Sequence, residues 1–146
     1  MKLYRSGPHT VFDLKYHLVW TTKYKKPILA GRIGTRVRDL IREICKTESV
    51  QIIRGHVSKD HVHLFLSLPP QLSISKMAQL LKGKTSRKIL QENPKLNKYF
   101  WGRHFWSRGY FATTSGAITD EMIVDYIKNQ DDDAEKRGDD FTVLEA

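Results

Sequence analysis

The sequence predicts an α+β fold of the ferredoxin-like type, in which a split β-α-β arrangement forms an antiparallel sheet with two helices on one face, followed by a C-terminal helix that carries Tyr126. Two observations predict it. The chain of 146 residues has the size of one domain, so we expect one core. Its apolar residues recur with a period that changes between strand and helix in the order β-α-β-β-α-β-α.

The first predicted strand covers residues 11–22, where apolar and polar side chains alternate as in a strand with one buried face. Its apolar members are Phe12, Leu14, Tyr16, Leu18 and Trp20. Pro27 and the lysines before it end this pattern. Apolar residues then recur at helical spacing to about Lys46, with arginines on the outside, which predicts a first amphipathic helix.

A hairpin and a second helix follow. Residues 50–57 and 61–68 are typical of two strands, and Ser58-Lys59-Asp60 between them predicts a tight turn, so the strands should pair. Ser73 is a helix-capping residue, and apolar residues recur after it at helical spacing until Pro94 ends the helix.

The last predicted elements are a strand over residues 105–114 and a third helix that reaches beyond Gln130. Ser115-Gly116-Ala117 predicts a flexible joint, Thr119 a helix cap, and the acids that follow stabilise the first helical turn. We therefore expect a single domain over residues 1–146, with residues 131–146 as an acidic C-terminal extension.

Charge is unevenly distributed along the chain. The formal net charge is +9, yet residues 131–146 hold seven acidic side chains and two basic ones. A basic body favours a polyanionic partner through counterion release, although solvated lysines that serve solubility would give the same composition.

Two kinds of protein are disfavoured by composition. No apolar stretch approaches the roughly 20 residues needed to span a bilayer, and the N-terminus lacks an apolar signal core, so we expect a cytoplasmic protein with no membrane partner. Cys45 is the only cysteine, which excludes an internal disulfide and a four-sulfur zinc site within one chain. We expect it to pack within a helix.

Two histidines are candidate metal ligands. His61 and His63 lie two apart on a predicted strand, so they share one face while Val62 and Leu64 point to the other. Two imidazoles near one point suit a metal ion. Histidine pairs on exposed strands also occur by chance, so the spacing alone leaves both interpretations open.

Tyr126 and Gln130 lie four apart on the third predicted helix, hence on one stripe together with Met122. Plain packing would also explain this stripe. A tyrosine hydroxyl, with a pKa of about 10, becomes an effective nucleophile toward phosphorus only when a nearby cation stabilises the developing charge. The two histidines and an amide oxygen could hold such a cation.

These residues stand in recognisable motifs. The segment Asp60-His61-Val62-His63-Leu64, followed by Tyr126-Ile127-Lys128-Asn129-Gln130, closely resembles the HUH single-tyrosine transposases of the insertion sequence 200/605 type. The resemblance covers nearly the whole chain. It includes Tyr16-His17-Leu18-Val19-Trp20, the basic second helix, and the aromatic run from Phe100 to Ser107.

The resemblance implies a mechanism and partners. His61, His63 and Gln130 would bind a divalent metal, Mg²⁺ or Mn²⁺, and Tyr126 would attack a phosphate in single-stranded DNA, forming a 5′-phosphotyrosine link and freeing a 3′-hydroxyl. The DNA would carry hairpins near the element ends. The protein would act in a bacterial or archaeal cell as a homodimer in which the tyrosine helix of one subunit completes the metal site of the other, with residues 115–117 as the hinge. The acidic extension departs from the compact members of the family.

Other residues permit two interpretations each. His56 could complete a three-histidine zinc site or point elsewhere. Asp60 could orient a histidine or simply belong to the turn. Three aromatic residues could stack on unpaired bases or lie in the core, and four basic residues of the second helix could contact the DNA backbone or form a solvated face. The aromatic set is Trp101, Phe105 and Trp106, and the basic set is Lys82, Lys84, Arg87 and Lys88.

Three rival functions remain at this stage. A domesticated relative would process palindromic DNA by the same chemistry without moving an element. A non-catalytic domain would bind single-stranded nucleic acid through exposed aromatic side chains on the sheet. A metal phosphodiesterase would use activated water and form no covalent intermediate.

Overall fold

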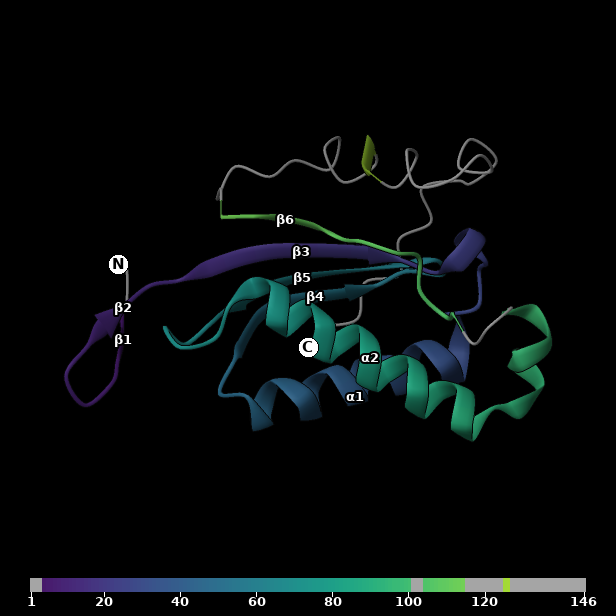
Figure 1. Ribbon diagram of the computed structural model, residues 1–146, viewed down its shortest axis with the longest axis horizontal. Helices are drawn as coiled ribbons and strands as arrows, with labels where there is room; N and C mark the ends of the chain where they lie inside the picture. Colours follow the sequence, from purple (N-terminus) through teal and green to yellow (C-terminus); the bar gives the residue numbers. More distant parts are fainter. Residues whose placement is uncertain (1–3, 101–103, 115–124, 127–146) are drawn as a thin grey trace.

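The computed structural model describes residues 4–100, 104–114 and 125–126. Four antiparallel strands form the main sheet, in the order β4-β5-β3-β6, and two helices cover one of its faces (Figure 1). The described chain also contains a small two-stranded sheet and two 3₁₀ turns. The bounds of all these elements are β1 (Arg5–Ser6), β2 (Val11–Phe12), β3 (Lys15–Thr21), η1 (Lys23–Lys25), α1 (Gly31–Thr47), β4 (Gln51–Val57), β5 (His61–Ser67), α2 (Ile74–Glu92), η2 (Pro94–Tyr99) and β6 (Phe111–Thr113).

The strand order confirms the ferredoxin-like prediction. β5 lies between β3 and β4 and is antiparallel to both, so β3 and β4 run in the same direction and α1 connects them across the sheet. β6 adds to the free edge of β3. The two central strands are therefore β3 and β5, which are paired over all seven residues of each.

The core lies between the sheet and the two helices. Alternate residues of the central strands point to it, and Leu18, Trp20, Val62 and Leu66 are fully buried. Helix residues such as Leu81 meet them from the other side. Burying one such aliphatic side chain contributes roughly 1.5–3 kcal/mol, so this layer is the main source of stability. Cys45 is also buried on α1, as expected from the sequence.

The predicted strand over residues 11–22 is divided in two. β2 pairs with β1 in a separate hairpin, and β3 begins only at Lys15. The strand breaks where its partner stops pairing. Leu68, directly after β5, donates from its backbone N to Leu14 O at 2.8 Å, and Pro69 and Pro70 follow it. Proline cannot donate to a sheet ladder, so the pairing stops there.

The predicted strand over residues 105–114 is also shorter than expected. Only Phe111–Thr113 pairs with β3, whereas Trp106 makes an isolated bridge to Thr22. Phe105 and Trp106 are consecutive and both buried, which a regular strand with one core face does not allow. Gly109, with φ +86°, then turns the chain.

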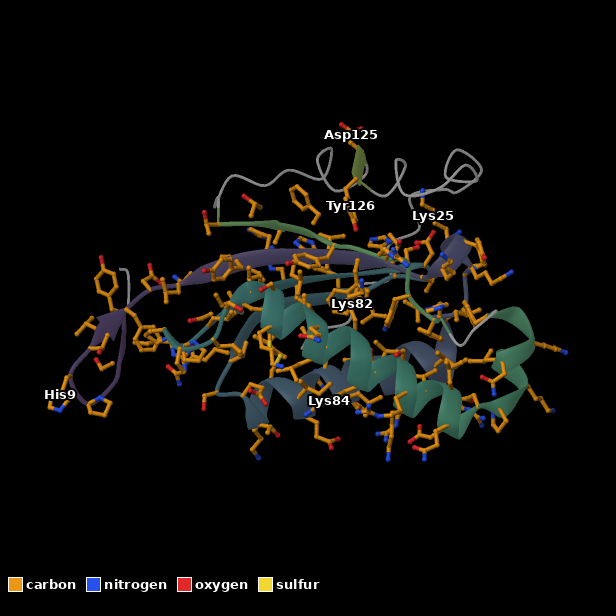
Figure 2. All side chains as sticks on the ribbon, in the orientation of Figure 1. His9, Lys25, Lys82, Lys84, Asp125 and Tyr126 are labelled. Carbon is orange, nitrogen blue, oxygen red and sulfur yellow. The ribbon has the colours of Figure 1, made fainter. Side chains whose placement is uncertain are left out.

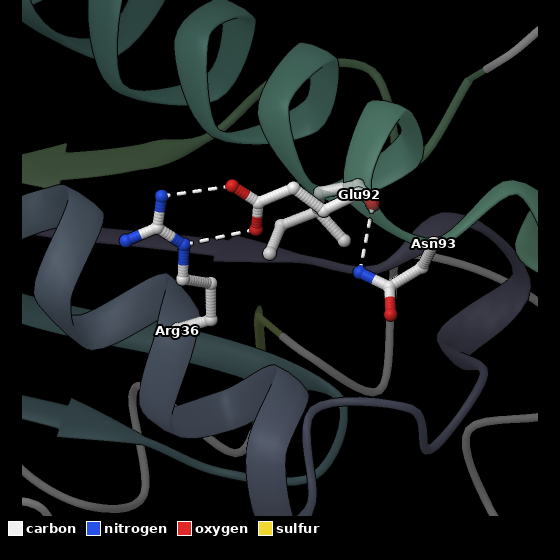
Figure 3. A network of polar contacts seen from close by, with 4 residues as sticks. Arg36, Glu92 and Asn93 are labelled. Carbon is white, nitrogen blue, oxygen red and sulfur yellow. Dashed lines mark hydrogen bonds and ion pairs between the residues drawn. The ribbon is translucent and has the colours of Figure 1, made fainter.

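The second helix begins as predicted. The Ser73 side chain accepts a hydrogen bond from Lys76 N at 3.1 Å, and the helix ends at Asn93, whose side-chain amide donates to Ile89 O at 2.9 Å. Figure 3 shows the same end of α2 joined to α1 by Arg36, which donates two hydrogen bonds to Glu92, of 2.9 and 2.8 Å. Among the described residues, no helix has both the length and the apolar character needed to cross a membrane.

Candidate active site

The face of the sheet opposite the helices carries the predicted histidine pair. β5 alternates as expected, with Val62 and Leu64 in the core and His61 and His63 on the open face. The register with β3 places Thr21 opposite His61 and Val19 opposite His63. The prediction that the two imidazole rings lie on one face of a strand is therefore confirmed.

His61 is held by the residue before it. Its Nδ1 lies 2.9 Å from Oδ1 of Asp60, and both side chains are only 6% exposed. A carboxylate accepts, so Nδ1–H donates, and this tautomer leaves the lone pair on Nε2. Asp60 is thus more than a turn residue, and its position directly before a candidate ligand was the signal in the sequence.

His63 contacts two further histidines. Its Nε2 lies 3.1 Å from Nδ1 of His17 on β3, and the His17 ring stacks on Phe65 with centroids 4.2 Å apart. The ring of His56, the β4 partner of His63, lies 5.8 Å away on the same face. The contact of His17 with His63 could not be predicted from the sequence, since it follows from the pairing of β3 with β5.

The electrostatic surroundings keep His63 neutral. Burial, followed by the effect of His17, His56, His61 and Arg54, lowers the pKa of His63 to about 3. Burial and Arg54 lower the pKa of His17 as well. A neutral imidazole retains the lone pair that a metal requires. His56 faces the same side, yet no three His, Cys, Asp or Glu side chains of the described residues are grouped to hold a metal ion.

Tyr126 lies over the same open face. Figure 2 shows it on the side of the sheet away from α1 and α2, with its side chain directed toward the strands. Its ring centroid is 5.6 Å from that of Phe111 on β6. Phe111 pairs with Val19, and Val19 pairs with His63, so the tyrosine contacts one end of a row of side chains that also contains His63.

The Tyr126 hydroxyl is buried. Its oxygen has no hydrogen-bond partner in the part of the chain that the structure describes. Burial raises the pKa of Tyr126 to about 12. Such a hydroxyl is protonated at neutral pH, and a cation or phosphate group beside it would offset the cost of its burial.

The donor set fits a divalent ion in part. His61 and His63 offer two imidazoles from one strand, and the buried Tyr126 oxygen faces the same side of the sheet. Two protein ligands leave coordination positions for oxygen atoms. Gln130, the third predicted ligand, lies outside the described residues, as do the predicted hinge at residues 115–117, Trp101, and the acidic extension.

The predicted DNA-contacting residues of α2 divide into two groups. Lys84, Arg87 and Lys88 line a groove beside α1, on the helical layer and away from the histidines. Lys82 instead donates to Ser107 O at 2.9 Å and to Gly109 O at 2.6 Å, and so fixes the chain that leads to β6. Contact of these four residues with DNA stays a prediction.

The open face of this antiparallel ferredoxin-like sheet thus presents paired histidines and a tyrosine. The family profile described as "Transposase IS200 like" matches residues 10–130. The chain therefore belongs to the family of IS200-like transposases, which confirms the resemblance found in its motifs.

Individual relatives agree with this membership. The ISDra2 transposase TnpA of Deinococcus radiodurans is 34% identical over 128 residues, which is 88% of this chain and 91% of that protein. The transposase for insertion sequence element IS200 of Salmonella typhimurium is 33% identical over 126 residues, covering 86% of this chain and 82% of that protein.

Two solved structures are similar in fold. A Deinococcus radiodurans crystal structure described as a candidate transposase has a TM-score of 0.80 and 32% identity, covering 86% of this chain and 97% of that one. A REP-associated tyrosine transposase, solved bound to a REP hairpin, has a TM-score of 0.53 at 14% identity, covering 84% of this chain and 67% of that one. The second likeness shows a shared fold.

Proposed function

We propose that this protein cleaves and rejoins single-stranded DNA at the ends of an insertion sequence, with Tyr126 as the nucleophile. One observation carries the proposal: in a chain of the transposase family, a buried tyrosine hydroxyl faces the side of the sheet that carries His61 and His63. His61 and His63 lie on β5, and Tyr126 packs beside Phe111 of β6, so the fold brings residues that are far apart in the sequence to one face.

The proposed step conserves bond energy. The Tyr126 oxygen forms a bond to phosphorus, the bond from phosphorus to the 3′-oxygen breaks, and the tyrosine proton passes to that leaving oxygen. The products are a 5′-phosphotyrosine and a free 3′-hydroxyl, and the reverse attack by another 3′-hydroxyl rejoins DNA. One phosphodiester replaces another, so no ATP is required.

Metal dependence is the second part of the proposal. His61, His63 and Gln130 would hold Mg²⁺ or Mn²⁺, and the ion would polarise a phosphate oxygen and stabilise developing charge. The pKa of about 12 for Tyr126 supports this, because an uncharged, buried phenol attacks poorly unless charge develops next to a cation. Asp60 would orient His61 toward the ion by accepting from the other ring nitrogen.

The proposed partner is single-stranded DNA with hairpin ends, bound by a homodimer whose subunits share their active sites. The net charge of +9 supports a phosphate-rich partner. The REP hairpin bound to the REP-associated tyrosine transposase, which shares this fold, supports the proposal that this chain recognises hairpins.

The test is a covalent adduct. The purified protein is incubated with Mg²⁺ or Mn²⁺ and a labelled single strand that carries its own element end, and a denaturing gel is examined for protein-linked DNA. We expect an adduct that is lost in Tyr126→Phe and in His61→Ala. The matched control is Tyr110→Phe, which removes a hydroxyl from a tyrosine that is 37% exposed, and it should retain the adduct.

Other results would favour the rival functions. Tight binding that is unchanged in Tyr126→Phe, without adduct on any element end, would indicate a non-catalytic binding domain. Cleavage without an adduct would indicate a phosphodiesterase that uses water. A domesticated relative would form the same adduct but act on genomic palindromes, and the sequences that flank its gene would identify it.

A further inference from the structure

Besides the groove beside α1, the protein has a pocket that lies away from the face carrying the histidines. It has a volume of about 290 Å³ and lies between α2, η1 and the segment of residues 104–108 (Figure 2 labels Lys82 on its α2 side). Its lining residues are Lys23, Lys82, Gly83, Ser86, His104, Phe105, Trp106, Ser107 and Arg108. The proposed cleavage chemistry uses none of them.

The charge of this pocket has one sign. Lys23, Lys82 and Arg108 are basic, and none of the described residues that line the pocket is acidic. Lys82 is fixed in place, because two backbone carbonyls accept its hydrogen bonds. Basic groups of one sign around a concave surface focus a positive potential, which attracts an anion.

Gly83 forms part of the wall of this pocket. It lies inside α2, where glycine destabilises a helix relative to alanine. A Cβ at this position would meet no atom within 4 Å, so packing does not require glycine there. The missing side chain instead leaves open space on the wall of the pocket.

Backbone hydrogen bonds connect the pocket to the candidate active site. Ser107 N donates to Thr21 O at 2.9 Å, and Thr21 is the β3 partner of His61. Ser107 and His61 are therefore separated by two strand spacings, about 10 Å. The same strand of nucleic acid could reach both places.

We propose that this pocket binds a backbone phosphate of the DNA strand, at a position outside the bond that is cleaved. Its function would be to fix the path of the strand so that the scissile phosphate arrives over the histidine face. The DNA as ligand rests on the proposed function, whereas the anion-binding character rests on the pocket alone.

The first test compares two double variants of equal charge. Lys23→Gln with Arg108→Gln removes two positive charges from the pocket, and the control, Arg32→Gln with Lys46→Gln, removes two from exposed positions of α1 that line neither the pocket nor the groove. Binding of a fluorescent single strand is measured by anisotropy at several salt concentrations. Loss of one phosphate contact should lower the slope of log affinity against log salt by about 0.7, in the pocket variant and not in the control.

A variant without charge change provides a second test. Gly83→Leu should fill the pocket while favouring the helix, so we expect several-fold weaker DNA binding at an unchanged or higher melting temperature. Equal slopes for the two double variants, or full affinity in Gly83→Leu, would overturn the proposal. Inorganic phosphate alone distinguishes a general anion site: if it stabilises the native protein against heat and this effect is lost in the pocket variant, but DNA binding is unaffected, the pocket serves free phosphate.

The adduct assay separates this proposal from the previous one. If no adduct forms on any element end but the slope still falls in the pocket variant alone, the pocket binds a nucleic-acid phosphate and the cleavage function is wrong. If the adduct forms and the slopes of both double variants are equal, the cleavage function stands and the pocket proposal fails.

Discussion

At the scale of single residues, the two candidate metal ligands differ in what orients them. His61 donates to the Asp60 carboxylate, whereas His63 shares a hydrogen bond with another imidazole, that of His17. A carboxylate only accepts, so the tautomer of His61 is fixed, and its Nε2 is the nitrogen that can bind a metal.

We predict that Asp60→Asn weakens binding of Mn²⁺ by roughly 10–100-fold. An asparagine amide can turn its NH₂ toward Nδ1 of His61, which would then move the ring proton to Nε2 and remove the lone pair. Calorimetric titration with Mn²⁺ and the metal concentration for half-maximal adduct formation measure this. Asp39→Asn, at an exposed aspartate of α1, is the control, and equal effects in the two variants would show that Asp60 does not orient the ligand.

The sequence predicted only part of this site, for a physical reason. That His61 and His63 share a face follows from the two-residue period of one strand, which is local information. The contact of His63 with His17 joins residues 46 apart in the sequence and depends on the register of β3 with β5. No periodicity reports such a register, so His17 was visible only as a strand residue.

At the scale of elements, the two faces of the central strand β5 serve different purposes, one functional and one structural. One face carries the histidines, and the other places Leu64, 1% exposed, in the core. We predict that Leu64→Ala lowers the free energy of unfolding by about 2–5 kcal/mol, because it removes a buried side chain and leaves a cavity.

Urea denaturation followed by circular dichroism measures this loss. Ile53→Ala is the comparison, since Ile53 lies on β4 at a bulge and is 46% exposed, and it should change stability by no more than about 0.5 kcal/mol. A similar loss for both would mean that the layer between sheet and helices is not the main source of stability.

The element boundaries show which strand properties are local and which are not. The hairpin of β4 and β5 and the Ser73 cap were predicted well because each depends on neighbouring residues. The long strands predicted over residues 11–22 and 105–114 were wrong, since a strand continues only while its partner can pair. Pro69 ends the partner of the first, and the burial of both Phe105 and Trp106 interrupts the second.

At the scale of the whole molecule, the sheet separates a helical layer from an open face (Figure 1). The groove lined by Lys84 and Arg87 belongs to the first, Tyr126 and the histidines to the second, and the basic pocket at Arg108 lies on the side of α2 that faces the chain leading to β6. Charged side chains on all of these surfaces together attract or repel a DNA strand at long range, so the electrostatic contribution to DNA binding depends on the charge of the whole chain.

The acidic extension offers a way to test that long-range effect. Residues 131–146 hold seven acidic and two basic side chains in a chain of net charge +9, so their removal makes the remainder more basic. We predict that a chain ending at Gln130 binds single-stranded DNA more tightly than the full chain at low salt, and that the difference shrinks as salt screens the charges. Anisotropy measurements over a range of salt concentrations would show the two affinity curves converging.

A second variant distinguishes charge from length. Replacing the seven acids of residues 131–146 by asparagine and glutamine keeps the extension and removes its negative charge. If charge repulsion limits binding, this variant should reproduce the tighter, more salt-dependent binding of the shortened chain. If it instead behaves like the full chain while truncation alone tightens binding, the extension blocks the DNA surface by its bulk, and electrostatic repulsion from the tail is excluded as the cause.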